Sequence, residues 1–281
     1  MPVVSINQHR INVTETGDGQ DVILAVHSSG KSHRQWQGLG ERAAESYRLV
    51  AADVFGHGRT DAWSGDADMS LASEVAVLQS LVANLPGRRV HLVGHSYGGA
   101  VAIKAMETLP VASLTLVEPA AFWMLDPESD REVRAEIWQV ARVLAHAIEI
   151  GEPENGMRVF VDYWNGYGTF EALPTSQRAR LIGQATTIAM QFRALFGENM
   201  NFLARRRIAA PTLLIHGDRA RKPILRIIDR LFREIATCDV RVIAGAGHMS
   251  PCTHEAEVSS MILRHLASTG MAQNDIRAVR S

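Results

Sequence analysis

The sequence Val90-His-Leu-Val-Gly-His-Ser-Tyr-Gly-Gly-Ala100 joins an apolar run of strand length to a helix-length segment through Gly94-His95-Ser96-Tyr97-Gly98. The two glycines flank the serine at a distance of two residues, which is the pattern G-x-S-x-G. A serine on so sharp a turn needs small neighbours at these positions, because a side chain there would collide with the backbone that crosses it. The pattern therefore predicts a strand, a tight turn that exposes the Ser96 hydroxyl, and a helix.

Strand and helix signals alternate on both sides of this turn. Runs rich in Val, Ile and Leu, apolar on both faces, indicate buried parallel strands at 22–26, 47–52, 89–93, 112–117, 211–215 and 240–243. Helix-length segments lie between them at 32–44, which opens with a Ser32-x-x-Gln35 capping box, and at 70–84, 97–108, 222–235 and 253–267. This alternation predicts an α/β fold with a doubly wound, mostly parallel sheet.

Segments 3–6 and 10–15 at the amino terminus are too close together for a crossover helix. We expect them to pair as an antiparallel hairpin at one edge of the sheet, which brings the sheet to eight strands.

The alternation stops between Glu118 and Pro211, where about 90 residues intervene. This stretch has helical periodicity and holds a large share of the aromatic residues. It predicts a helical cap, residues 121–206, inserted after the sixth strand of a core domain formed by 1–120 and 207–281. The aromatic residues are interpreted first as the core of the cap. Some of them, Trp123 and Trp164 in particular, are also expected to form an apolar roof over a substrate.

Composition excludes several classes of protein. The 281 residues are 46% hydrophobic and 21% charged, and 29 Lys and Arg against 30 Asp and Glu give a net charge of −1. No basic cluster is present, so nucleic acid is not an expected partner. The first residues do not form a basic segment followed by an apolar one, and no run reaches about 18 apolar residues. We therefore expect a cytoplasmic chain without a membrane span.

Metal ligation is not indicated by the cysteines or histidines. Cys238 and Cys252 lack the spacing of metal ligands, and both are expected to be free thiols. His91 and His95 have ligand-like i,i+4 spacing, but on a strand they lie roughly 13 Å apart. No metal and no cofactor is expected.

Four further motifs accompany the serine turn in a fixed order. They are Leu24-Ala-Val-His-Ser-Ser-Gly30, Asp53-Val-Phe-Gly-His-Gly-Arg-Thr60, Ile215-His-Gly-Asp218 and Gly245-Ala-Gly-His-Met-Ser-Pro251. With these motifs the chain resembles the α/β-hydrolase fold family, and in particular its capped esterases and lipases. The resemblance covers nearly the whole chain, and it implies an eight-stranded hydrolase fold with Ser96 as the nucleophile.

A serine hydroxyl is a weak nucleophile until an imidazole within hydrogen-bond reach accepts its proton. His248 is the candidate base, because it lies in a short loop after the last core strand, next to Gly247, and precedes a helix. His57 and His95 are the alternatives. We expect His57 to hold backbone groups in its glycine-rich turn, and His95 to direct its ring away from the serine.

Negative charge on the carbonyl oxygen requires preorganised donors. The resemblance implies the backbone N–H of Tyr97 and an N–H in the loop after His27, where Ser29 is the expected donor. Ser28 stands where the family usually has glycine, so its β-carbon restricts the approach of an acyl group. The Ser28 and Ser29 hydroxyls are an alternative set of donors.

The acid of a catalytic triad is missing from its usual position. The resemblance places it two residues beyond the Gly-Asp of the strand-end turn, where this chain has Ala220. Glu118, at the end of the preceding core strand, and Asp218 are the two candidates. Glu118 is preferred, because the position of Asp218 is generally that of a structural turn residue, and some relatives such as haloalkane dehalogenases place the acid after the earlier strand.

The resemblance implies hydrolysis of a carboxylic ester or thioester of a medium-sized hydrophobic small molecule through an acyl-enzyme. The same residues would serve a carbon-carbon, amide or lactone hydrolase or a perhydrolase. A catalytically silent small-molecule-binding protein is a further alternative, supported by the empty acid position. A dehalogenase or epoxide hydrolase is disfavoured, because those enzymes have Asp at the position of Ser96. The oligomeric state is left open.

Overall fold

The computed structural model describes residues 3–6, 8–65, 68–85, 87–198 and 208–278. The strands are β1 (Val3–Ile6), β2 (His9–Thr16), β3 (Asp21–Val26), β4 (Tyr47–Ala52), β5 (Val90–His95), β6 (Ser113–Val117), β7 (Thr212–Gly217) and β8 (Cys238–Ile243). The helices of the sheet domain are α1 (Gln37–Ala43), α2 (Leu71–Ala83), α3 (Tyr97–Ala105), α10 (Lys222–Glu234), α11 (Ser250–Thr253) and α12 (Glu255–Ala278).

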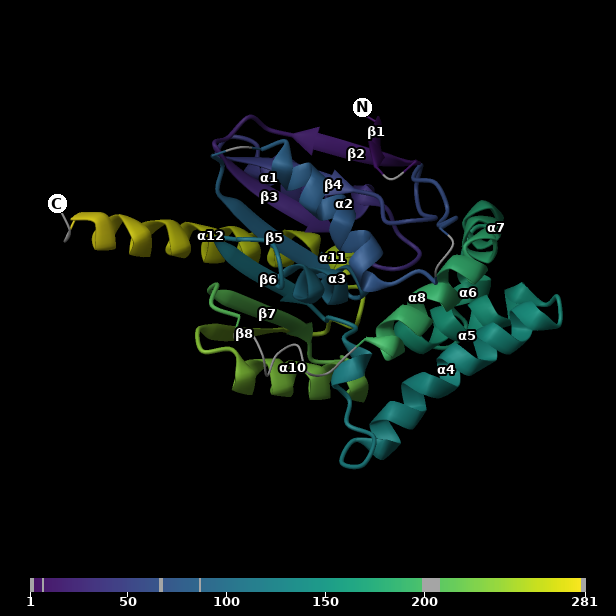
Figure 1. The fold of residues 1–281 in the computed structure, drawn as a ribbon. Helices are drawn as coiled ribbons and strands as arrows, with labels where there is room; N and C mark the ends of the chain where they lie inside the picture. Colours follow the sequence, from purple (N-terminus) through teal and green to yellow (C-terminus); the bar gives the residue numbers. More distant parts are fainter. Residues whose placement is uncertain (1–2, 7, 66–67, 86, 199–207, 279–281) are drawn as a thin grey trace.

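The described strands form one eight-stranded sheet in the order β1-β2-β4-β3-β5-β6-β7-β8 (Figure 1). β1 pairs with β2 and β2 with β4 in antiparallel orientation, and every other pairing is parallel. The amino-terminal hairpin and the mostly parallel sheet are thus confirmed. The chain moves outward from β3 to β4 and then returns to β5 on the other side of β3. A crevice forms at such a reversal, beyond the carboxyl ends of the strands, and it is where ligands bind in open α/β sheets.

Both faces of the sheet are buried, which explains why the strands are apolar at consecutive positions. In β3, Val22, Leu24 and Val26 belong to the buried cluster that includes α2, α3 and α10. Ile23 and Ala25 point to the opposite face and pack with α1 and α12. Successive side chains of a strand face opposite sides, so two helical layers require an uninterrupted apolar run. The doubly wound arrangement is confirmed.

The first crossover begins differently from the prediction. Instead of one helix from Ser32, a 3-10 helix, η1 (His33–Trp36), precedes α1, and the Ser32 side chain caps neither. The Gln35 side chain accepts hydrogen bonds from the Ser28 backbone N–H and hydroxyl instead, at 3.3 and 2.9 Å. The predicted capping box is therefore wrong, because the Gln35 carboxamide, which would complete the box, binds the buried Ser28 instead.

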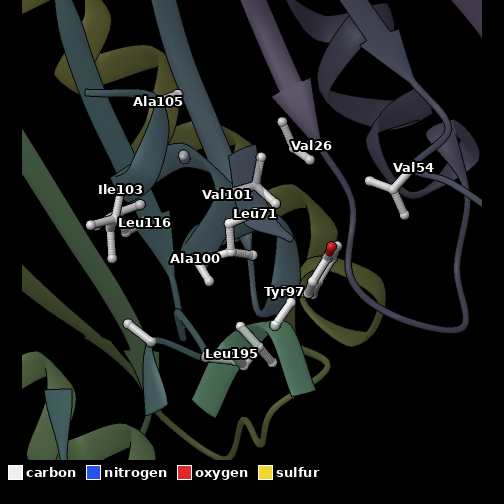
Figure 2. Packing of buried hydrophobic residues seen from close by; sticks show 14 of the residues in the cluster. Val26, Val54, Leu71, Tyr97, Ala100, Val101, Ile103, Ala105, Leu116 and Leu195 are labelled. Carbon is white, nitrogen blue, oxygen red and sulfur yellow. The ribbon is translucent and has the colours of Figure 1, made fainter. Parts of the chain in front are cut away.

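A helical segment, defined here as residues 122–197, lies between β6 and β7. It contains η2 (Phe122–Met124), α4 (Arg131–Glu149), α5 (Pro153–Asn165), α6 (Thr169–Ala172), α7 (Thr175–Gly183) and α8 (Ala185–Gly197). Figure 1 shows α4 to α8 gathered beside the sheet. Leu195 of α8 shares a buried cluster with Tyr97 and Ala100 of α3 (Figure 2). The division into a core, 1–120 and 207–281, and a cap, 121–206, stays a prediction, and its second boundary falls outside the described residues.

A helix that spans a membrane is both long and apolar throughout. Across the described ranges, no helix combines the length and the apolar character that crossing a bilayer requires.

The turn at Ser96 has the crowding that the glycine pattern predicts. Ser96 has a φ of 53°, in the left-handed region that side chains rarely adopt. A Cβ on Gly98 would lie 2.3 Å from the Val26 carbonyl oxygen, and a Cβ on Gly94 would lie 2.3 Å from the carbonyl oxygen of Gly98. The end of β3, the end of β5 and the start of α3 therefore meet at contact distances that only glycine allows.

We expect Gly98→Ala to lower the free energy of unfolding by about 3 kcal/mol, because the new Cβ meets backbone that cannot move aside. Urea denaturation followed by circular dichroism measures the change. The control is Gly183→Ala at the end of α7, where a Cβ meets no atom within 4 Å. That variant should gain about 0.5 kcal/mol from the reduced freedom of the unfolded chain. Equal stabilities of the two variants would contradict this account of the turn.

Candidate active site

Three segments distant in sequence meet where β5 ends. Ser96 follows β5, Glu118 follows β6, and His248 lies in the loop after β8. Ser96 Oγ is 2.9 Å from His248 Nε2, and His248 Nδ1 is 2.7 Å from Glu118 Oε2. Since a carboxylate only accepts hydrogen bonds, Nδ1 carries the imidazole proton and donates it to Glu118. Nε2 is then the acceptor for the Ser96 hydroxyl, which is the arrangement needed to take up its proton during attack.

Glu118 is the carboxylate that the fold brings to His248. It is fully buried, and its second oxygen accepts the Gly217 backbone N–H at 3.0 Å. Asp218 is exposed and accepts the Gly245 backbone N–H at 2.9 Å, so it joins the two strand-end turns rather than the histidine. The geometry agrees with the preference for Glu118 and with the turn role expected of Asp218.

His95 acts on the other side of His248. It is fully buried, and its Nε2–H donates to the backbone carbonyl of His248 at 2.8 Å. Burial holds the pKa of His95 well below its usual value, so the ring is neutral. The other ring nitrogen, Nδ1, is 3.2 Å from Gln35 Oε1, so the partners of the ring are groups other than the Ser96 hydroxyl. The contact with the loop of His248 is one that the sequence did not indicate.

The loop after β3 lies against Ser96 and is fixed through both of its serine side chains. Ser28 Oγ donates to Gln35 Oε1 at 2.9 Å, and Ser29 Oγ donates to Gln191 Oε1 of α8 at 2.6 Å. Both hydroxyl protons are thus engaged, which leaves backbone N–H groups as the donors for an oxyanion. Tyr97 is the first residue of α3, where the N–H has no partner within the helix.

Gly30 in the same loop is held by its backbone. Its N–H donates to His57 Nε2 at 2.9 Å, and its carbonyl accepts from Arg180 of α7 at 2.9 Å. The other ring nitrogen of His57 donates to the Phe55 carbonyl at 2.9 Å. His57 therefore connects two backbone turns, as predicted, and Arg180 is a second contact between the helical segment and this loop.

A cavity with a volume of about 110 Å³ opens above Ser96. Its wall includes Ser28, Ser29, Ser96, Tyr97 and His248 from the sheet domain, and aromatic and aliphatic residues from the helical segment, among them Phe122, Phe160, Trp164, Leu181, Ile188, Phe192 and Leu195. The helical segment also contributes polar side chains to the wall, namely Asn165, Thr169, Gln177, Arg180 and Gln191. The helical segment and the strand ends thus form one binding space, which is mainly apolar on the helical side.

Of the two tryptophans expected near a substrate, Trp164 lines the cavity and Trp123 does not. Trp164 stacks on His248 with ring centroids 3.9 Å apart. Trp123 is 2% exposed and packs in the interior, whereas its neighbour Phe122 faces the cavity. Both residues lie in the 3-10 helix η2, in which consecutive side chains point about 120° apart. The assignment of Trp123 is therefore wrong by one residue.

Within the described residues, no three His, Cys, Asp or Glu side chains are placed to hold a metal ion.

The buried side chains of His27 and His57 are expected to make the protein less stable in acid. Burial lowers the pKa of His57 to about 3 and that of His27 to about 4. Unfolded histidine titrates near 6.5, so below that pH the unfolded chain binds more protons than the folded one. The stabilisation is complete above about pH 6.5 and declines as the pH falls toward 4.

His57→Gln removes one such group while an amide oxygen can still accept from Gly30. We expect it to flatten the fall in unfolding free energy between pH 6.5 and 4 by up to about 1.4 kcal/mol per pH unit, measured by urea denaturation at several pH values. The control is His146→Gln, at an exposed position on α4, which should keep the original slope. Parallel curves for both variants and the wild type would refute the prediction.

Comparison with known proteins identifies the family. The model of the alpha/beta hydrolase family matches residues 23–260. An uncharacterised protein of Mycobacterium tuberculosis is 34% identical over 88 residues, 31% of this chain, and the match spans about a quarter of that relative's length. The 2-hydroxy-6-oxononadienedioate/2-hydroxy-6-oxononatrienedioate hydrolase of Klebsiella pneumoniae is 23% identical over 92% of this chain and 91% of its own.

A similar solved structure is an esterase from Exiguobacterium antarcticum. It has a TM-score of 0.74 and 16% identity, and the alignment covers 94% of this chain and 98% of that one. At this low sequence identity, the structural similarity shows a shared fold alone. Since the family match extends over well above half of the sequence, this protein belongs to the alpha/beta hydrolase family.

Proposed function

We propose that this protein is a serine hydrolase that cleaves a carboxylic ester or thioester through an acyl-enzyme. The observation that carries the proposal is the unbroken hydrogen-bond chain from Ser96 through His248 to Glu118 at the floor of a cavity. A hydroxyl, an imidazole in the correct tautomer and a buried carboxylate are the three groups with which a serine triad carries out acyl transfer.

In the proposed reaction, Ser96 Oγ bonds to the carbonyl carbon while its proton passes to His248 Nε2. Glu118 stabilises the imidazolium that forms, and the backbone N–H groups of Tyr97 and Ser29 meet the charge on the carbonyl oxygen. Nε2 then gives its proton to the departing alcohol or thiol. Water then attacks the acyl carbon while His248 Nε2 accepts its proton. The proton passes on to Ser96 Oγ as the carboxylic acid leaves and the free serine is restored.

The cavity supports a medium-sized hydrophobic substrate. Aromatic and aliphatic side chains of the helical segment face Ser96 across it, and Trp164 covers one face of the imidazole. Apolar contact of this kind excludes water from the reacting groups and favours an acyl or alcohol group without charge at that surface.

Carbon-carbon bond hydrolysis is the second candidate, favoured by the Klebsiella relative that aligns along nearly the whole chain. A silent binding protein is less supported, because Glu118 supplies the carboxylate that Ala220 does not. Parallel assay of nitrophenyl esters and a vinylogous 1,5-diketone of matched size separates the two hydrolytic activities.

Ser96→Ala should lower kcat for a nitrophenyl butanoate by about 10⁴-fold or more, because the nucleophile is gone while the fold is kept. The release of nitrophenol measures the loss, and an unchanged circular dichroism spectrum is the control that shows that the variant is folded. A fluorophosphonate should add its mass to the Ser96 peptide of the wild type alone. An unlabelled serine together with undiminished turnover in the variant would exclude the serine mechanism.

Glu118→Gln and Asp218→Asn form a matched pair, since each exchanges one carboxylate for its amide. The first should lower kcat by about 10²- to 10⁴-fold, because the amide no longer stabilises the imidazolium or fixes its tautomer. The second should stay within a few-fold of the wild type, since its remaining oxygen still accepts from Gly245. Loss of activity in Asp218→Asn alone would reverse the assignment of the acid.

A further inference from the structure

Gln191 of α8 is a polar residue in the cavity wall that the proposed reaction does not use. It is 1% exposed, and its Oε1 accepts the Ser29 hydroxyl at 2.6 Å. Its Nε2 is buried and has no hydrogen-bond partner in the described part of the chain. Buried amide donors in folded proteins are nearly always paired, so an unpaired one at a binding cavity points to a group that arrives with the ligand.

The surroundings of this donor offer no internal substitute. Ile188, Phe192 and Leu195 are on the same helix, line the same cavity and are apolar. An amide donor among such side chains is destabilising until an acceptor reaches it. An oxygen on a bound substrate would remove that cost, whereas a methylene in its place would retain it.

The position of the carboxamide limits where that oxygen lies. Gln191 is one hydrogen bond away from the side chain of Ser29, whose backbone N–H is the proposed donor to the scissile carbonyl oxygen. The Nε2 group is therefore close to the reacting carbonyl. Lys31 and Arg180 also line the cavity, and their positive charge favours an electron-rich oxygen over a donor group.

We propose that Gln191 is a specificity-determining residue whose Nε2–H donates to an acceptor oxygen, an ether or ketone oxygen a few bonds from the scissile carbonyl. The preferred substrates are then oxygen-bearing esters rather than plain alkyl esters of the same shape. This inference rests on the proposed function, because it names the substrate class of the same site.

The test uses nitrophenyl alkanoates and analogues in which an ether oxygen replaces each methylene in turn. For each pair, the ratio of kcat/KM for the ether to kcat/KM for the alkyl ester is compared between variants, which cancels the intrinsic reactivity of the ester. Gln191→Met removes the amide and keeps the length of the side chain. Gln191→Glu keeps an acceptor for Ser29 and replaces the donor with an oxygen.

We expect the wild type to exceed Gln191→Met in this ratio by about 10-fold at one ether position, and Gln191→Glu to fall below Gln191→Met there. Gln139→Met, the same exchange at an exposed position of α4 that does not line the cavity, should keep the wild-type ratio. A residue that only braces Ser29 would slow ethers and alkyl esters by the same factor.

Equal ratios in the wild type and Gln191→Met at every position, with hydrolysis still dependent on Ser96, would overturn this inference and leave the proposed function intact. If Gln191→Met does not fold, the ratio in Gln191→Glu decides in the same way. If no ester is turned over faster by the wild type than by Ser96→Ala, the proposed function fails and this inference fails with it.

Discussion

The meeting of three backbone segments at Ser96 is the constraint on which the rest of the structure depends. Gly98 lies against the carbonyl of Val26, and Gly94 lies against the carbonyl of Gly98, both at distances that exclude a Cβ. This contact places the end of β5 beside the loop that leaves β3. The hydroxyl and the amides of that loop are neighbours because the backbone is packed there, and the Ser28 and Ser29 side chains then hold the loop in place.

Features that depend on local pattern could be predicted from the sequence. Consecutive apolar positions predicted strands buried on both faces, and the spacing of Gly94, Ser96 and Gly98 predicted the turn. The preference for Glu118 over Asp218 rests on the position of Asp218, which is generally that of a structural turn residue, and the hydrogen bond to His248 agrees with that preference.

Features that depend on tertiary packing could not be predicted from the sequence. Nothing in the sequence distinguishes Phe122 from Trp123, because the direction of each side chain follows from a 3-10 turn. Gln35 matched a local cap but bonds to a loop instead, and Gln191 has the appearance of a surface residue on an amphipathic helix. Long-range partners override local preference when the group is buried, since an unpaired polar atom there is costly.

The helical segment contacts the loop after β3 at two points, Ser29 with Gln191 and Gly30 with Arg180. The same two helices, α7 and α8, form part of the wall of the cavity. Any outward displacement of these helices that widened the entrance would stretch both bonds and free the loop that holds the proposed donor to the scissile carbonyl. A wider entrance for the substrate and a loop held in place are thus opposed. Mutations that loosen the helical wall would lower the rate of hydrolysis even where they ease the entry of substrate.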